Sequence, residues 1–96
     1  QPPTTIFYIS TMRSGCSDFC NANYLINTPR GTTGNDAYAN VIIGDVIAGS
    51  SLSAGWYAYA ASSTNTLSGT FRIMQVDSNN TITSLAECDN GVCQII

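Results

Sequence analysis

Four cysteines, grouped in two pairs near opposite ends of the chain, constrain the fold of this 96-residue sequence more than any other feature. The first pair, Cys16 and Cys20, lies in SGCSDFCNANY, and the second, Cys88 and Cys93, lies in CDNGVC. Spacings of three and four residues are near those of zinc sites, and reactive thiols are a further alternative. The chain has no histidine to act as a ligand or a catalytic partner, and an even number of cysteines in a small chain is typical of disulfides. We therefore predict two disulfides that staple the domain.

These disulfides can pair in three ways. Local bridges, Cys16–Cys20 and Cys88–Cys93, would close small loops and add little stability. Bridges between the two pairs would close loops of about 70 residues, worth roughly 4 kcal/mol each, because a cross-link reduces the entropy of the unfolded chain. We favour this second arrangement, with Cys20–Cys88 and Cys16–Cys93 as the pairing that suits antiparallel segments.

Composition indicates a neutral, exported protein. Hydrophobic residues make up 44% of the sequence, enough to form a core, so residues 1–96 are expected to fold as a single domain. Only 9% of the residues are charged and the three cations are Arg13, Arg30 and Arg72, so a basic surface for nucleic acid is not expected. No apolar run approaches the ~18 residues of a membrane span. With so few charges, the solubility of the chain depends on its Ser, Thr and Asn residues. Together with the predicted disulfides, this neutral polar composition predicts an extracellular or virion location.

Short runs of β-branched and aromatic residues, separated by turn residues about every ten positions, predict an all-β fold. The run 40–49 contains Gly44-Asp45, which predicts a buried strand with a bulge or a tight turn in its middle. Asx residues at 77–80 predict a hairpin loop, and residues 28–40 and 62–69 are expected to be loops. Strands are expected over residues 4–11, 22–27, 40–49, 55–62, 69–76, 81–87 and 91–96.

This pattern is that of a small antiparallel β-sandwich or barrel of six to seven short strands. Residues 1–5 are expected to form an extended leader, which is a candidate for strand exchange with a neighbouring sheet. The sequence begins at Gln1 without methionine, which indicates a processed chain or a piece of a longer one.

Candidates for chemistry are few. The acidic residues cannot be paired on one cleft wall from the sequence; they are Asp18, Asp36, Asp45, Asp77, Glu87 and Asp89. We interpret them as turn formers and solvated acids, with the Asp45 carboxylate capping N–H groups of its own turn. Asp77, Asn79 and Thr81 have the spacing of a calcium loop but lack its Gly and Glu, and Asn79-Asn80-Thr81 is an N-glycosylation sequon. We predict no catalytic residue, no metal and no cofactor.

The aromatic run Trp56, Tyr57 and Tyr59 provides candidate binding residues. Because side chains alternate along a strand, Tyr57 and Tyr59 share one face and Trp56 takes the other. An exposed tyrosine pair can stack on a sugar ring or fill a groove on a neighbouring subunit. Tyrosines are also common on solvent-facing strands for β-propensity alone. We take the three aromatic residues, with the loop 28–40, as a possible binding surface.

Short motifs spread over most of the chain form one pattern. Its positions are the aromatic strand Phe7-Tyr8, Cys20, Gly44-Asp45, Gly55 with Tyr57, the stretch 77–83 and Cys88. This pattern resembles a small cysteine-containing β module of phage tail and tail-fibre proteins and of secreted bacterial surface proteins. Cys16 and Cys93 depart from it. The resemblance implies an extracellular or virion building block, not an enzyme.

These features favour a non-enzymatic structural subunit of a virion appendage, such as a phage tail or fibre, or of an extracellular filament. Neutral polar faces repel each other little, and β edges at Ile95-Ile96 and at the leader can add a strand to a neighbouring sheet. The expected partners are copies of the chain or other structural subunits. The alternative is a receptor- or glycan-binding module for adhesion at a fibre tip or cell surface. A secreted enzyme or inhibitor is the least favoured.

Overall fold

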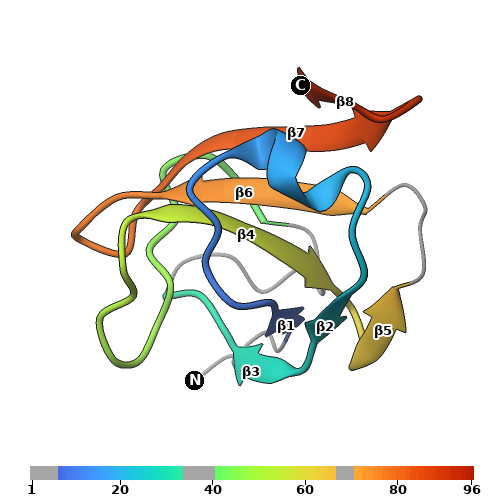
Figure 1. Cartoon of the computed structure of the whole chain (residues 1–96). Helices are drawn as coiled ribbons and strands as arrows, with labels where there is room; N and C mark the ends of the chain where they lie inside the picture. The colour runs from blue at the N-terminus through green and yellow to red at the C-terminus, as the bar shows by residue number, and fades with distance from the viewer. Residues whose placement is uncertain (1–6, 34–40, 67–70) are drawn as a thin grey trace.

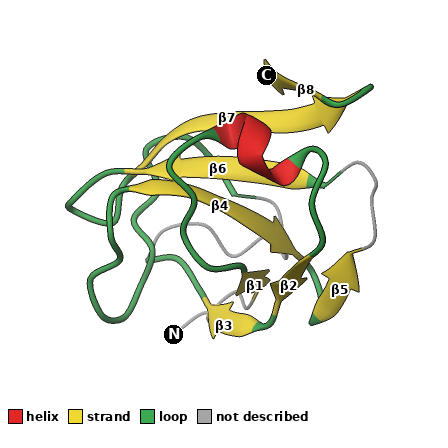
Figure 2. Cartoon of the chain, viewed as in Figure 1, coloured by secondary structure: helices red, strands yellow, loops and turns green. Residues whose placement is uncertain are grey.

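The computed structural model describes residues 7–33, 41–66 and 71–96. Within these ranges the chain is all-β, with eight strands and one short 3-10 helix, η1 (Figures 1 and 2). The expected antiparallel, disulfide-stapled β fold is confirmed, with one strand more than expected. The elements are β1 (Phe7–Ile9), η1 (Cys16–Phe19), β2 (Tyr24–Ile26), β3 (Thr28–Arg30), β4 (Gly55–Ala60), β5 (Thr64–Thr66), β6 (Arg72–Val76), β7 (Ile82–Asp89) and β8 (Val92–Ile95).

Six of the strands form one sheet in the order β3-β1-β4-β6-β7-β8, while β2 and β5 pair in a separate sheet. Cross-strand partners in the central strands define two faces, since directly opposed residues point to the same side. Tyr57 lies opposite Met74 on one face, and Ala58, Ile73 and Ala86 form a row on the other. Each face belongs to its own buried cluster, so the sheet has a core on both sides.

Hydrogen bonds outside the named strands close the sheet around the face that carries Tyr57 and Met74. Residues 31–33 continue β3 and bond to residues 46–48 at N···O distances of 2.8 and 3.0 Å. Residues 44–47 bond to the start of β7 and to the turn before it: the Ile82 N–H donates to the Asp45 carbonyl at 2.9 Å, and the Ile47 N–H donates to the Asn80 carbonyl at 2.8 Å. The hydrogen-bonded path thus runs from β1 through β4, β6 and β7 and returns to β3. This half of the molecule is a small barrel.

The barrel interior holds the larger core cluster. The rings of Phe7 and Tyr59 meet edge to face, with their centroids 6.3 Å apart. Each large aliphatic side chain buried here contributes about 1.5–3 kcal/mol, so this cluster is the main source of packing stability. Its members are Phe7, Ile9, Val41, Ile47, Tyr57, Tyr59, Met74, Val76 and Ile82.

The opposite face of β4, β6 and β7 is covered by η1 and by β2 (Figure 1). Phe19 of η1 meets Tyr24 of β2 edge to face, with ring centroids 5.0 Å apart. Beneath them the sheet presents small side chains, Ala58 and Ala86, which leave room for a helix turn to lie close to the strands. The molecule therefore combines the two expected architectures, a barrel on one side and a sandwich layer on the other.

Two segments expected to be loops contain short strands. β3 falls within the predicted loop 28–40, and its Pro29 lies opposite Tyr8. Proline, which lacks an N–H, is accepted in a strand at the sheet edge. β5 falls within the predicted turn 62–69 and pairs with β2 through a Thr-rich run. Both strands are three residues long. A strand this short does not contain enough alternation of polar and apolar residues to be recognised from the sequence.

The expected buried strand over residues 40–49 is wrong. Gly44 has φ of 99°, and the Asp45 N–H donates to the Ile42 carbonyl at 3.1 Å, so the chain turns tightly there. Ile42 and Ile43 are left more than half exposed, at 53% and 54%. The turn anticipated at Gly44-Asp45 is confirmed, but residues 46 and 47 after it form only isolated β-bridges and no strand.

Candidate functional site

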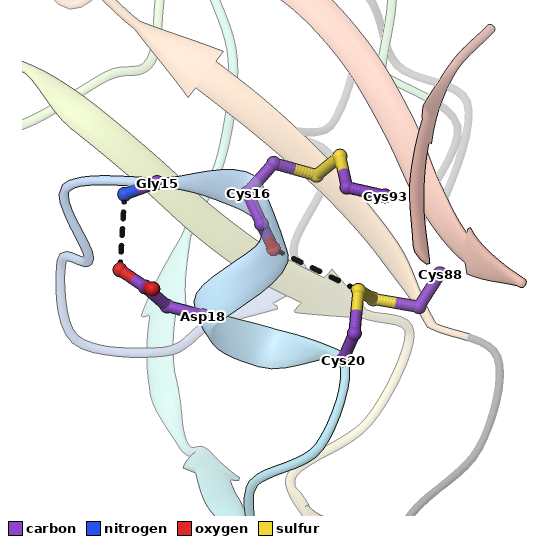
Figure 3. The surroundings of a disulfide bond; sticks show 6 residues. All are labelled: Gly15, Cys16, Asp18, Cys20, Cys88 and Cys93. Atoms are coloured by element: carbon purple, nitrogen blue, oxygen red, sulfur yellow. Dashed lines mark hydrogen bonds between the residues drawn. A yellow bond between two sulfur atoms is a disulfide. The ribbon is translucent and has the colours of Figure 1, made fainter. Parts of the chain in front are cut away.

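All four cysteines are joined in the favoured pairing, Cys16–Cys93 and Cys20–Cys88 (Figure 3). Their Cα atoms are 5.8 and 5.3 Å apart, which is ordinary disulfide spacing. Since no free cysteine remains, the zinc and reactive-thiol interpretations are wrong.

The two bridges attach η1 to the hairpin formed by β7 and β8. The start of η1 is fixed by Asp18, whose carboxylate accepts a hydrogen bond from the Gly15 N–H at 3.1 Å (Figure 3). Cys16 and Cys88 are buried in the second core cluster. The disulfides therefore hold η1, the loop around Gly15 and the β7–β8 hairpin together as one unit.

The β8 strand lies at the edge of the six-stranded sheet and pairs with β7 (Figure 1). It is connected to β7 by a two-residue turn in which Asn90 and Gly91 have φ of 52° and 79°. Positive φ at both positions is the type I′ geometry, whose twist suits a tight hairpin. Cys93 ties β8 to η1, so this edge is held covalently at its centre.

Apolar side chains on and next to β8 face solvent. Val92, Ile95 and Ile96 are 57%, 63% and 60% exposed. Soluble proteins usually protect such an edge with lysine, proline or a bulge. β8 has neither lysine nor proline, and its register against β7 is regular. The outer edge of β8 is therefore an accessible strand-pairing surface.

The expectation of an exposed tyrosine pair is wrong. Tyr57 and Tyr59 are each 3% exposed and lie in the barrel interior. The Tyr57 hydroxyl donates to the Ser53 carbonyl at 2.6 Å, and Tyr59 interacts with Arg72 of the neighbouring strand. Both faces of β4 are covered, so neither ring can stack on a ligand in this structure.

Burial of these phenols predicts a loss of stability at alkaline pH. Burial raises the pKa of Tyr57 and Tyr59 above its ordinary value, while nearby arginines partly oppose the shift. A raised folded-state pKa means that the folded protein favours the protonated phenol. The contribution of each buried phenol to the free energy of unfolding is therefore complete below about pH 10 and is lost as the pH rises through the folded-state pKa. We expect the free energy of unfolding to fall only above about pH 10.

Spectroscopic titration of the tyrosines, in parallel with urea unfolding, measures this effect. Tyr59→Phe removes one of the two late-titrating groups and should make the alkaline decline shallower. Tyr8→Phe changes a half-buried tyrosine outside the barrel interior and serves as the control. If all tyrosines ionise in one step near pH 10 while the protein remains folded, the expectation fails.

Trp56, the third predicted binding residue, is half-buried and lines a groove of about 530 Å³. The groove lies where β4 begins and β6 ends, and β7 contributes Thr83 to it. Since β8 pairs with the other end of β7, the groove and the β8 edge are separate surfaces. Of the predicted binding loop 28–40, residues 34–40 lie outside the described residues, as does the leader 1–5.

The acidic residues in the described ranges do not converge. Asp77 caps its own turn, as its Oδ1 accepts hydrogen bonds from the Asn79 and Thr81 N–H groups at 2.8 and 3.0 Å. This confirms the hairpin turn. The capping role predicted for Asp45 is not seen at its Oδ2, which is buried without a hydrogen-bond partner in the described structure. The described ranges hold no cluster of three metal-ligating side chains, and Asp36 lies outside them.

Comparison with protein-family models, curated proteins and solved structures found no match to this chain. In the described ranges, no helix has the length and apolar character needed to cross a bilayer. The sequence indicated Ile95-Ile96 and Trp56 but missed Val92 and the polar residues around Trp56, because their exposure depends on strand pairing.

Proposed function

We propose that this protein is a non-enzymatic structural subunit of an extracellular or virion assembly, joined to copies of itself through the β8 edge. The carrying observation is an exposed, apolar edge strand that a disulfide holds in place. Two disulfides in a small domain suit an oxidising compartment. With only 9% of the residues charged and a net charge of −3, electrostatic repulsion between approaching copies is small.

The register of β8 identifies the backbone groups that can join a neighbour. The Ile96 N–H donates to the Leu85 carbonyl at 2.9 Å. Because hydrogen-bonded pairs alternate along an antiparallel ladder, Gln94 and Val92 also bond to β7. The N–H and C=O groups of Cys93 and Ile95 therefore point away from β7. A second β8 strand running antiparallel can bond to both.

Such pairing would be two-fold symmetric and would close after two copies. A longer assembly needs a second, different contact. The exposed turn residues Ile42 and Ile43 are suited to it, because this turn bonds to the start of β7 while β8 pairs with the end of β7. Two different apolar surfaces at opposite ends of one strand permit growth beyond the dimer, with the β8 contact and the second contact alternating along the assembly.

Ile95→Pro tests the edge contact without removing a bond to β7. The substitution removes an outward N–H and an exposed apolar side chain, and proline is tolerated where an edge N–H faces solvent. We expect association to weaken at least about tenfold, since a lost hydrogen bond costs about 1 kcal/mol and lost apolar burial adds to it. Analytical ultracentrifugation of the oxidised protein over a concentration series measures this.

Leu25→Lys is the matched control, because Leu25 is 54% exposed but lies on β2, which is not a strand of the six-stranded sheet. It should leave association unchanged. Ile95→Lys should weaken association as Ile95→Pro does. A wild-type protein that stays monomeric at all concentrations, or association that is unaffected by both Ile95 variants, contradicts the proposal.

A further inference from the structure

The groove beside Trp56 is separate from the β8 edge and is unused by the proposed assembly. Its walls come from four parts of the chain: the loop before η1, the start of β4, the end of β6 with its turn, and β7. A volume of about 530 Å³ is in the range typical of small-molecule sites. We infer that this groove is a binding site for a neutral sugar ring.

The chemistry of the walls favours a neutral polyhydroxyl ligand. Trp56 offers an aromatic surface, and Gln75, Ser78 and Thr83 offer amide and hydroxyl groups that both donate and accept hydrogen bonds. Asp77 adds a carboxylate, an acceptor suited to sugar hydroxyls. An aromatic surface surrounded by such groups matches a sugar ring, which has apolar C–H faces and a hydroxyl rim.

The charge of the groove disfavours anionic ligands. No arginine is among its described lining residues, and Asp77 is the single charged residue there. Arg13 is adjacent in sequence to the groove residue Met12, but its guanidinium carbon lies 5.6 Å from the centroid of the Phe19 ring, against the second core cluster. A phosphate, a nucleotide or an acidic sugar would meet a carboxylate without a compensating cation.

The groove is also rigid before any ligand arrives. The backbones of Trp56 and Arg13 exchange two hydrogen bonds of 2.9 Å. The Thr83 hydroxyl donates to the Gln75 carbonyl at 3.3 Å, and Asp77 is held by its turn. Groups that are already ordered lose little entropy on binding, which favours even a small ligand.

Gly55 shapes one wall of the groove. A Cβ atom at this position would lie 2.6 Å from the Met12 Cγ and 3.0 Å from the Arg13 carbonyl oxygen. The absence of a side chain at Gly55 therefore lets the Met12 side chain lie across the start of β4. Met12 is 41% exposed and adds an adaptable apolar contact beside Trp56.

Trp56 is the only tryptophan in the chain, so in the folded protein tryptophan fluorescence comes from the residue that lines the groove. The wild-type protein is titrated with glucose, galactose, mannose, N-acetylglucosamine and their neutral disaccharides, and with glucuronate as an acidic sugar. We expect a saturable fluorescence change with at least one neutral sugar, at a dissociation constant of about 1 mM for a monosaccharide. Glucuronate should bind at least about tenfold more weakly than glucose.

Isothermal calorimetry then tests the location of the site. Trp56→Ala should weaken sugar binding at least about tenfold. Ser78→Arg, at an exposed turn position on the groove rim, blocks the groove without altering either core cluster and should have the same effect if Trp56→Ala fails to fold. Leu25→Lys should bind as the wild type does.

Three results would overturn the inference. One is the absence of saturable binding by every neutral sugar, and another is equal binding of glucuronate. The third is binding that survives both Trp56→Ala and Ser78→Arg. None of these measurements depends on association through β8. A negative sugar-binding result therefore does not contradict the proposed assembly, and a negative association result does not contradict the proposed sugar site.

Discussion

Replacement of all four cysteines by alanine is expected to lower the free energy of unfolding by about 7 kcal/mol, most of the stability of a domain this small. The bridges are nested, since Cys16–Cys93 encloses Cys20–Cys88. Either bridge alone closes a long loop, worth about 4 kcal/mol. Once one is present, the other closes only the short path through residues 16–20 and 88–93, worth about 2.5 kcal/mol.

This nesting distinguishes single-bridge variants from the unbridged chain. Cys16→Ala/Cys93→Ala and Cys20→Ala/Cys88→Ala should each lose about 2.5 kcal/mol, less than half of the loss for the chain without bridges. Urea unfolding followed by Trp56 fluorescence measures all four proteins. Single-bridge losses that add up to the loss for the unbridged chain would show that the bridges act independently, against our expectation.

Asn80→Ala is expected to lower the free energy of unfolding by about 3–4 kcal/mol, a large effect for a residue in a turn. The buried Asn80 amide accepts a hydrogen bond from the Leu52 N–H at 2.9 Å and donates to the Ile47 and Ser50 carbonyls at 3.1 and 3.0 Å. These bonds fix the segment 47–52 against the barrel. Alanine leaves the buried groups unpaired and must adopt the left-handed φ of 61°.

Two control variants separate these contributions. Asn90→Ala places alanine at an exposed turn with φ of 52° and should show the backbone cost alone, about 1 kcal/mol. Asn79→Ala removes the exposed neighbour and should change stability by less than about 0.5 kcal/mol. Thermal and urea unfolding provide the comparison. If Asn80→Ala costs no more than Asn90→Ala, the side-chain bonds contribute little.

The sequence predicted the cysteine pairing and the hairpin regions well. Two cysteine pairs at distant positions made long-range bridges the stabilising choice, and Asp77 to Asn80 have the side chains that a tight turn requires. Strands longer than four residues, such as β4, β6 and β7, carry enough alternation to be recognised from sequence. These parts of the fold follow from local chemistry.

The site was predicted less well because exposure depends on tertiary packing. An antiparallel strand usually has one solvated face, which made Tyr57 and Tyr59 candidates for the surface. In this fold the closure of the barrel buries one face of β4, and η1 with β2 covers the other. Neither covering segment can be placed from sequence. Trp56 stays half-buried and lines the groove because it lies at the start of β4.

The nested bridges also determine how the molecule carries mechanical load. Tension applied to the chain before Cys16 and after Cys93 passes directly across the sulfur–sulfur bond. The intervening chain, a sequence separation of 77, includes β4, β6 and β7 and bears none of this tension. Under such a pull, most of the sheet remains folded until a covalent bond breaks.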